Sequence, residues 1–384
     1  MADDSKEFAK GLEDVIAGES SICDVDGKNG KLIYRGYDIH DLAQNTTFEE
    51  VVYLLWNAKL PTRAELTAFG GELGAGRALP EPALALMRQF PRAAPPMDAL
   101  RTTASLLALY DPDLGDESME ANKRKALRLT ARMGTMVAAL DRLRRGEEPL
   151  APRPELSTAA NFLYQLKGTE PSETESRALD VALILHADHE LNASTFAARV
   201  TVATLTDMYS AVTSAVGTLA GSLHGGANVN VMNLLERIGT PDRAEAVVTQ
   251  MLAEGKKIPG IGHRVYRALD PRAVSLREMS RRLAGSTGDS RWYEISEKVQ
   301  EAADQALAAR GKTTLKANVD FFSASVYHML GIPNDQFTPV FAISRVAGWT
   351  AHILEQLGDN RLIRPRAIYT GPRDLRVVPV GERR

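Results

Sequence analysis

The spacing of apolar residues predicts a chain built almost entirely from helices. Runs such as "FEEVVYLLWN" and "ESRALDVALILHA" repeat apolar residues every three or four positions, which gives a helix one buried face. Pro and Gly interrupt these runs, and no alternation of strand and helix indicates a parallel sheet. Capping boxes, in which Ser or Thr precedes Glu by three residues, mark three predicted helix starts: Thr47 with Glu50, Thr62 with Glu65, and Ser172 with Glu175.

Further patterns complete the predicted fold. The segment "ICDVDGKNGKLIYRGYDI" has two short β-prone runs around a turn and predicts a small hairpin near the N-terminus. Residues 194–221 are rich in small side chains, which favours close helix packing at the centre of the protein or at a dimer interface. Glycine-rich breaks at 221–228 and 258–266 predict either hinges or points of close approach. We therefore expect an all-α fold with a large domain (1–218 and 327–384) and a small domain (219–326).

Composition and charge restrict the partners. The chain has 384 residues, of which 44% are hydrophobic and 25% charged, and a formal net charge of -3 with both signs interspersed. This balance indicates no surface for nucleic acid or an anionic membrane, so we expect small-molecule substrates or other subunits. The single cysteine, Cys23, excludes an internal disulfide and fits a reducing compartment. The polar start "MADDSKEFAKGLEDV" and the interrupted apolar runs predict neither a signal peptide nor a membrane span, which favours the cytoplasm.

Three polar residues lie in apolar or glycine-rich surroundings. Asp320 is near the start of "VDFFSASVYH", where burial would raise its pKa toward values suited to a base; the alternative is a structural cap. His224 precedes "GGAN" and a helical run, so we expect a neutral ring at a helix N-terminus that donates a hydrogen bond to an oxyanion. His263 follows the glycines of "GIGHRVY", where a ligand can reach the backbone. Each alone has a structural interpretation, but together they indicate a catalytic constellation.

Metal and nucleotide sites have weaker support. His186 and His189 in "HADHE" share one helix face, a spacing that suits a metal, but neither an HExxH pattern nor a cysteine accompanies them. "GKTT" (311–314) resembles the end of a phosphate loop, but Ala306 stands in place of the first glycine. Three arginines in apolar or Pro-containing surroundings instead need anionic partners, either protein carboxylates or a small dicarboxylate: Arg272, Arg345 and Arg364.

These segments together resemble the citrate synthase family. The resemblance runs along nearly the whole chain, from "YRGYDIHDLA" through "LILHADHELNASTFAARV", "LHGGAN", "GIGHRVYRALDPRA", "NVDFFSASVYHMLGIP" and "SRVAGWTAHILEQ" to "RLIRPRAIYTGP". It implies a nearly all-α, two-domain homodimer of the tricarboxylic acid cycle, which condenses acetyl-CoA with oxaloacetate and water to give citrate and coenzyme A. Acetyl-CoA is then a substrate, and the resemblance implies no metal or redox cofactor.

The resemblance also implies a role for individual residues. It makes Asp320 the base that removes a proton from the acetyl-CoA methyl group, His224 the donor to the thioester oxygen, and His263 the residue that polarises the oxaloacetate carbonyl. It assigns oxaloacetate binding to His189, His224, His263, Arg272, Arg345, and Arg364 from the other subunit. It assigns coenzyme A binding to Lys257, Pro259, Gly260, Gly262, Arg267 and Asn318. Closure of the small domain over oxaloacetate is expected to exclude water.

The sequence departs from the family pattern in two places and leaves three rival functions open. Ser222 and Val229 replace a proline and a carboxylate that the family often has around "LHGGAN", so we expect a looser loop. The chain lacks the extra N-terminal region of the hexameric, NADH-inhibited members, which predicts a simple dimer. A 2-methylcitrate synthase, which uses propionyl-CoA, shares the named residues, and one methylene provides only about 1 to 3 kcal/mol of discrimination. An acyl-CoA hydrolase and a helical scaffold without catalytic activity are the remaining two.

Overall fold

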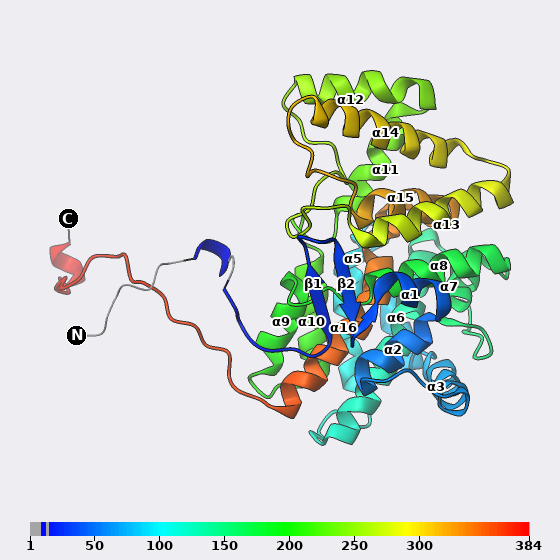
Figure 1. Ribbon diagram of the computed structural model, residues 1–384. Coiled ribbons are helices and arrows are strands. Elements are labelled where there is room, and N and C mark those ends of the chain that lie inside the picture. The colour runs from blue at the N-terminus through cyan, green and yellow to red at the C-terminus, as the bar shows by residue number, and fades with distance from the viewer. Residues whose placement is uncertain (1–8, 13–14, 384) are drawn as a thin grey trace.

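The computed structural model describes residues 9–12 and 15–383 (Figure 1). The polar start that predicts no signal peptide falls largely outside these residues. Within them the chain forms sixteen α-helices, five short 3-10 helices and one small sheet, which confirms the all-α prediction. Every helix in this part of the chain is too short or too polar to cross a lipid bilayer.

The sheet consists of three short antiparallel strands near the N-terminus. They are β1 (Cys23–Asp26), β2 (Lys31–Tyr34) and β3 (Tyr37–Asp38), so the predicted hairpin is confirmed and a third strand extends it. The β1–β2 turn packs closely against the loop that carries His263. A Cβ atom on Gly27 would lie 2.4 Å from the carbonyl oxygen of Val265, and the backbone N–H of Arg267 donates to the carbonyl of Gly27 over 2.8 Å. Only glycine permits this close approach.

Eleven of the α-helices form the larger of two groups. They are α1 (Ile39–Asn45), α2 (Phe48–Asn57), α3 (Arg63–Gly76), α4 (Glu81–Met87), α5 (Pro96–Leu107), α6 (Met119–Arg145), α7 (Thr158–Lys167), α8 (Glu173–His186), α9 (Ala193–Val202), α10 (Met208–Leu219) and α16 (Phe337–Gly358). The three predicted capping boxes are confirmed at the starts of α2, α3 and α8. Helix α16 is buried along nearly its whole length and packs against α2, α6, α8, α9 and α10, so it forms the centre of this group.

The second group lies at the top of Figure 1. It contains α11 (Ala227–Ile238), α12 (Ala244–Ala253), α13 (Pro271–Thr287), α14 (Arg291–Ala308) and α15 (Val319–Met329). Helices α13 and α15 also pack against α8 of the larger group. The division into domains at 219–326 stays a prediction. The 3-10 helices are η1 (Lys10–Leu12), η2 (Ala108–Tyr110), η3 (Pro241–Arg243), η4 (Asn334–Gln336) and η5 (Val380–Glu382).

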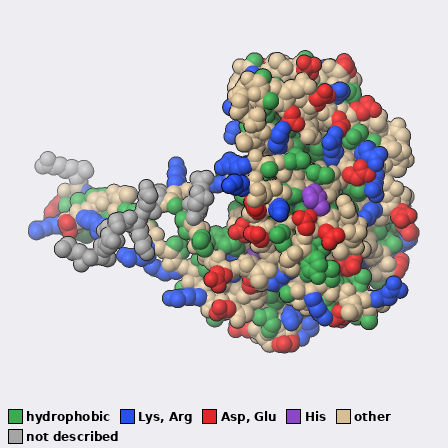
Figure 2. All heavy atoms as spheres, in the orientation of Figure 1, with side chains coloured by type: hydrophobic (Ala, Val, Ile, Leu, Met, Phe, Trp, Pro, Cys, Tyr) green, Lys and Arg blue, Asp and Glu red, His purple; other side chains and the backbone are tan. Residues whose placement is uncertain are grey.

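The chain beyond α16 leaves the body of the molecule. Residues 359–383 extend outward on the same side as the N-terminal segment (Figure 1). They expose several large apolar side chains, among them Leu362, Ile368 and Val377. On the face drawn in Figure 2, acidic and basic side chains are interspersed over the body, in agreement with the balanced composition.

Candidate active site

Asp320 lies in the first turn of α15, where it meets the glycine-rich loop. The side-chain oxygen of Asn318, the N-cap, accepts the backbone N–H of Asp320 over 3.0 Å. The amide nitrogen of Asn318 donates to the carbonyl of Gly262 over 2.9 Å. Burial raises the pKa of Asp320 to about 6, although the charge of Arg272 opposes this shift. A carboxyl group in this range is a stronger base than an ordinary aspartate and still ionises at neutral pH.

His263 is a neutral donor in this structure. Its Nδ1 accepts the backbone N–H groups of Val265, at 3.0 Å, and Tyr266, at 3.1 Å. Because both partners are donors, the ring proton belongs on Nε2. Burial, assisted by the charge of Arg272, lowers the pKa of His263 to about 4. The ring can therefore donate a hydrogen bond from Nε2 at neutral pH.

His224 lies in the turn before α11 rather than at the helix start. The helix begins at Ala227, and its N-cap, Gly226, makes no side-chain hydrogen bond. The Nε2 atom of His224 is 2.8 Å from Oγ of Ser194, and Nε1 of Trp349 donates to the same oxygen over 3.0 Å. Burial and then the charge of Arg345 lower the pKa of His224 to about 4. The ring is neutral as predicted, and burial is the main cause.

His189 follows α8 and faces the loop that carries His263. The two ring centroids are 5.5 Å apart, and Nε2 of His189 is 3.2 Å from the hydroxyl of Tyr266. Burial, with the charges of Arg272 and His263, lowers the pKa of His189 well below its usual value. The structure thus brings His189 and His263 together from segments that are distant in sequence.

Arg272 has a protein carboxylate as its partner. Its Nε and Nη2 atoms donate to the two carboxylate oxygens of Asp270 over 2.9 and 2.8 Å. Asp270 also accepts the backbone N–H of Val319, next to Asp320, over 3.0 Å. Arg272 thus has a protein carboxylate as a partner, one of the two kinds that the sequence leaves open, and this pair uses only its Nε and Nη2 atoms. The sequence predicts no role for Asp270, whose one local signal is its position as N-cap of α13.

Arg345 is a buried cation without a carboxylate partner among the described residues. It is 2% exposed, donates from Nε to the carbonyl of His186 over 2.6 Å, and lies over the ring of Phe341. Burial lowers the pKa of Arg345, which reflects the cost of the charge at this position. Such a guanidinium is suited to a small anionic ligand.

The remaining predicted residues lie outside this cluster or at its edge. Gly260 and Gly262 have positive φ angles of 74° and 96° in the loop beside Asn318. Three predicted basic residues are exposed: Lys257, Arg267 and Arg364. Pro259 is partly buried. Arg364 is exposed in the segment that follows the end of α16. Within the described residues, no group of three or more His, Cys, Asp or Glu side chains could hold a metal ion.

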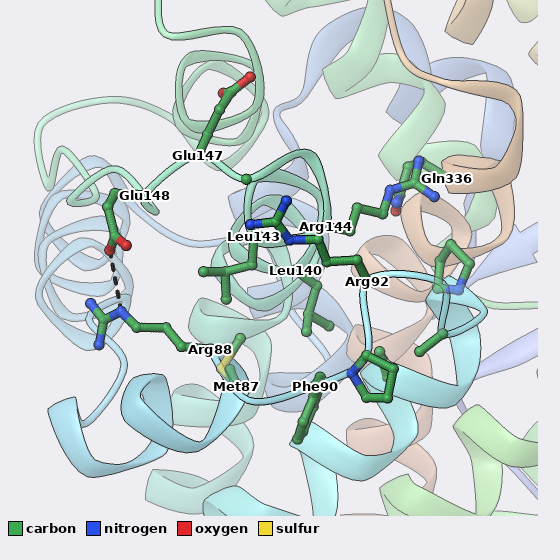
Figure 3. Close-up of a pocket in the computed structure, with 15 residues that line it drawn as sticks. Met87, Arg88, Phe90, Arg92, Leu140, Leu143, Arg144, Glu147, Glu148 and Gln336 are labelled. Carbon is green, nitrogen blue, oxygen red and sulfur yellow. Dashed lines mark hydrogen bonds and ion pairs between the residues drawn. The ribbon is translucent and has the colours of Figure 1, made fainter.

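Two cavities lie elsewhere in the molecule. One, of about 220 Å³, is lined by side chains of α4, α6 and nearby loops. At one side of it Nε of Arg88 donates to Oε2 of Glu148 over 3.2 Å (Figure 3). Another, of about 490 Å³, lies between α1, α8 and α13. Neither is lined by a residue that the sequence predicts for the site. The candidate site is therefore the cluster around Asp320, Arg272 and Arg345, which lies outside both cavities.

A family model, curated relatives and solved structures all place this chain in one family. A family model described as citrate synthase, C-terminal domain, matches residues 11–366. Citrate synthase 2 of Bacillus subtilis is 50% identical over 375 residues, which cover 97% of this chain and 99% of that protein. Citrate synthase of Haloferax volcanii is 49% identical and covers 99% and 100%. A 2-methylcitrate synthase of Shewanella oneidensis is 41% identical, with 100% of both chains covered.

Solved structures that resemble this chain belong to the same family. Citrate synthase from Pyrobaculum aerophilum has a TM-score of 0.91 at 42% identity, covering 98% of this chain and 95% of that one. Citrate synthase from Thermoplasma acidophilum, in a ternary complex with carboxymethyl coenzyme A and oxaloacetate, has a TM-score of 0.90 at 34% identity, covering 98% and 100%.

Proposed function

Because the chain belongs to the citrate synthase family, we propose that it condenses acetyl-CoA with oxaloacetate and water to give citrate and coenzyme A. The observation that carries this proposal is one cluster that contains a carboxyl group of raised pKa, two neutral histidines and a buried arginine without a carboxylate partner in the described chain. The charges of Arg272 and Arg345 both act on Asp320. A base, two hydrogen-bond donors and an anion site are what this condensation requires.

In the proposed first step, Asp320 takes a proton from the acetyl-CoA methyl group while His224 donates a hydrogen bond to the thioester oxygen. The thioester α-proton is weakly acidic, so the donor must stabilise the enolate as its charge develops. Donation by the Ser194 hydroxyl to Nε2 of His224 would leave the ring proton on Nδ1 for this purpose. The lowered pKa of His224 supports the role, because at neutral pH the ring is neutral and keeps its one N–H proton for donation to the thioester oxygen.

In the second step, the enolate carbon attacks the oxaloacetate carbonyl, which His263 polarises from Nε2. Arg272, Arg345 and His189 hold the carboxylates of oxaloacetate. Arg345 supports this assignment most directly, because a bound carboxylate would supply the partner that its buried guanidinium lacks within the described chain. Hydrolysis of the resulting citryl-CoA thioester then releases citrate and coenzyme A.

The same proposal includes the assembly and the binding of coenzyme A. The loop of Lys257, Pro259, Gly260, Gly262 and Arg267, with Asn318 behind it, would bind coenzyme A. A homodimer would bring Arg364 from the extended segment of one subunit into the other subunit's site. Residues 219–326 would close over oxaloacetate as a small domain. The exposure of Arg364 and the hydrogen bonds between Asn318 and the glycine loop are consistent with these roles.

The release of free coenzyme A tests the function. Wild type and Asp320→Asn are assayed with acetyl-CoA and propionyl-CoA, each with and without oxaloacetate. We expect release that depends on oxaloacetate, favours acetyl-CoA and falls by roughly a thousandfold in the variant. Oxaloacetate-independent release would indicate an acyl-CoA hydrolase, and no release from either substrate would refute the proposal.

A preference for propionyl-CoA is the second candidate function. The similarity to 2-methylcitrate synthase over the full chain favours including it, although the identity is lower than to the citrate synthases. A higher kcat/KM for propionyl-CoA in the same assay would assign the chain to that activity.

A further inference from the structure

Tyr266 connects two histidines of the candidate site. The residue is 2% exposed, and its ring centroid lies 5.6 Å from that of His189 and 4.8 Å from that of His263. Its hydroxyl is 3.2 Å from Nε2 of His189. The guanidinium of Arg272 lies 5.8 Å from the ring centroid. The sequence predicts no role for Tyr266, although the residue is three positions after His263.

The hydrogen bond between Tyr266 and His189 has a definite direction. Burial raises the pKa of Tyr266 and lowers that of His189, so both groups are neutral at physiological pH. Among the described residues, His189 is the one acceptor within hydrogen-bond distance of the Tyr266 hydroxyl. If the hydroxyl accepted from His189, its own proton would be buried and unpaired, which is costly. The hydroxyl therefore donates to Nε2, and the proton of His189 lies on Nδ1.

The backbone behind His189 is held rigidly. The hydroxyl of Tyr34 accepts the N–H of Asp188 over 3.1 Å and donates to the carbonyl of the same residue over 2.8 Å. The carboxylate of Asp188 is 3.2 Å from Nε2 of His352, and the N–H of Gly348 donates to the carbonyl of Ala187 over 3.1 Å. The freedom left to His189 is thus rotation of its side chain, and the Tyr266 hydroxyl restricts that rotation.

Tyr266 is itself fixed to the loop of His263. Its backbone N–H donates to Nδ1 of His263 over 3.1 Å. The next residue, Arg267, donates its backbone N–H to the carbonyl of Gly27 in the β1–β2 turn, which holds the loop against that turn. One short segment therefore sets the proton position of both rings: a backbone N–H places the proton of His263 on Nε2, and the side chain places the proton of His189 on Nδ1.

We propose that Tyr266 is a positioning residue for oxaloacetate, which acts by fixing the orientation and tautomer of His189. The proposal rests on the proposed function, because it needs His189 to contact oxaloacetate. Tyr266 makes no contact with the thioester in this scheme. Its loss should therefore weaken oxaloacetate binding and leave the chemical step and the affinity for acetyl-CoA nearly intact.

The variant Tyr266→Phe removes only the hydroxyl. We expect the KM for oxaloacetate, and its Kd from isothermal titration calorimetry, to rise roughly three- to tenfold, with kcat and the KM for acetyl-CoA changed by less than about twofold. Tyr209→Phe is the matched control, because Tyr209 is equally buried and its hydroxyl binds Asp111, outside the site. The control should leave both KM values unchanged. A wild-type KM and Kd for oxaloacetate in Tyr266→Phe would overturn the proposal.

A double-mutant cycle tests whether Tyr266 acts through His189. Adding Tyr266→Phe to His189→Asn should raise the Kd for oxaloacetate no further than His189→Asn alone. Independent, multiplicative effects of the two changes on that Kd would refute the positioning role. The calorimetric Kd keeps this result separate from the proposed function: wild type that binds oxaloacetate but releases no coenzyme A would refute the function and leave the Tyr266 comparison intact.

Discussion

At the scale of single residues, Asp320 controls the expected pH dependence. Burial raises its pKa to about 6, whereas the pKa values of His224 and His263 are lowered to about 4. The base must be ionised and the two histidines neutral, and of these three groups only Asp320 has a pKa between about 5 and about 8. We expect kcat/KM for acetyl-CoA, at saturating oxaloacetate, to be constant above this pKa and to fall about tenfold per pH unit below it.

Rates measured across this range check the assignment. Rapid return of acid-treated enzyme to neutral pH controls for unfolding, because activity lost by protonation alone recovers. A profile that stays flat down to about pH 5 would mean that Asp320 has an ordinary pKa or is not the base.

The residues that sequence analysis found and missed differ in a physical way. His224, His263 and Asp320 stand in unusual local surroundings, so local pattern was sufficient to propose them as a constellation; their catalytic roles stay predictions. Whether Arg272 would pair with a protein carboxylate or a ligand depended on Asp270, which looks like an ordinary helix cap. The partner of His224, Ser194, is 30 residues away and has no distinctive local pattern. Tertiary hydrogen bonds of this kind leave no local signal.

At the scale of elements, local rules predicted the helix starts that capping residues mark. The three capping boxes are confirmed because they depend on residues within one turn. The hairpin was confirmed, but β3 was missed because it has two residues, too few for a periodic pattern. The start of α11 falls three residues after His224, since Gly225 is held between the carbonyl of Leu219 and the side chain of Thr338.

The glycine loop gives a prediction about close packing. Gly260 and Gly255 have nearly equal φ angles, 74° and 71°, but a Cβ atom on Gly260 would lie 2.7 Å from Val231 and 2.9 Å from Phe321, whereas Gly255 has open space. Both alanine variants lose about 1 kcal/mol because of the positive φ. Gly260→Ala should lose a further 1 to 3 kcal/mol or so by overpacking, and should also raise the KM for acetyl-CoA.

Urea denaturation of the two variants measures the difference in the free energy of unfolding. Gly255→Ala is the control for the backbone term and should retain the wild-type KM. Equal losses of stability would contradict the close approach at Gly260.

At the scale of the whole molecule, the extended segment after α16 needs an explanation. It carries the exposed Arg364 and also exposes Leu362, Ile368 and Val377 to solvent. Exposed apolar side chains of this kind do not stabilise a single conformation of the segment in an isolated chain. A second copy of the chain, in the proposed homodimer, would both cover it and receive the arginine.

Mixed dimers test this exchange of Arg364. Asp320→Asn and Arg364→Ala are each expected to have little activity, because each breaks both sites of its own homodimer. If Arg364 enters the partner's site, a mixed dimer keeps one intact site, formed by Asp320 of one subunit and Arg364 of the other. Co-expression in equal amounts should then restore about one quarter of wild-type activity, since half of the dimers are mixed. If Arg364 acted within its own subunit, neither site of a mixed dimer would be complete, and co-expression would restore nothing.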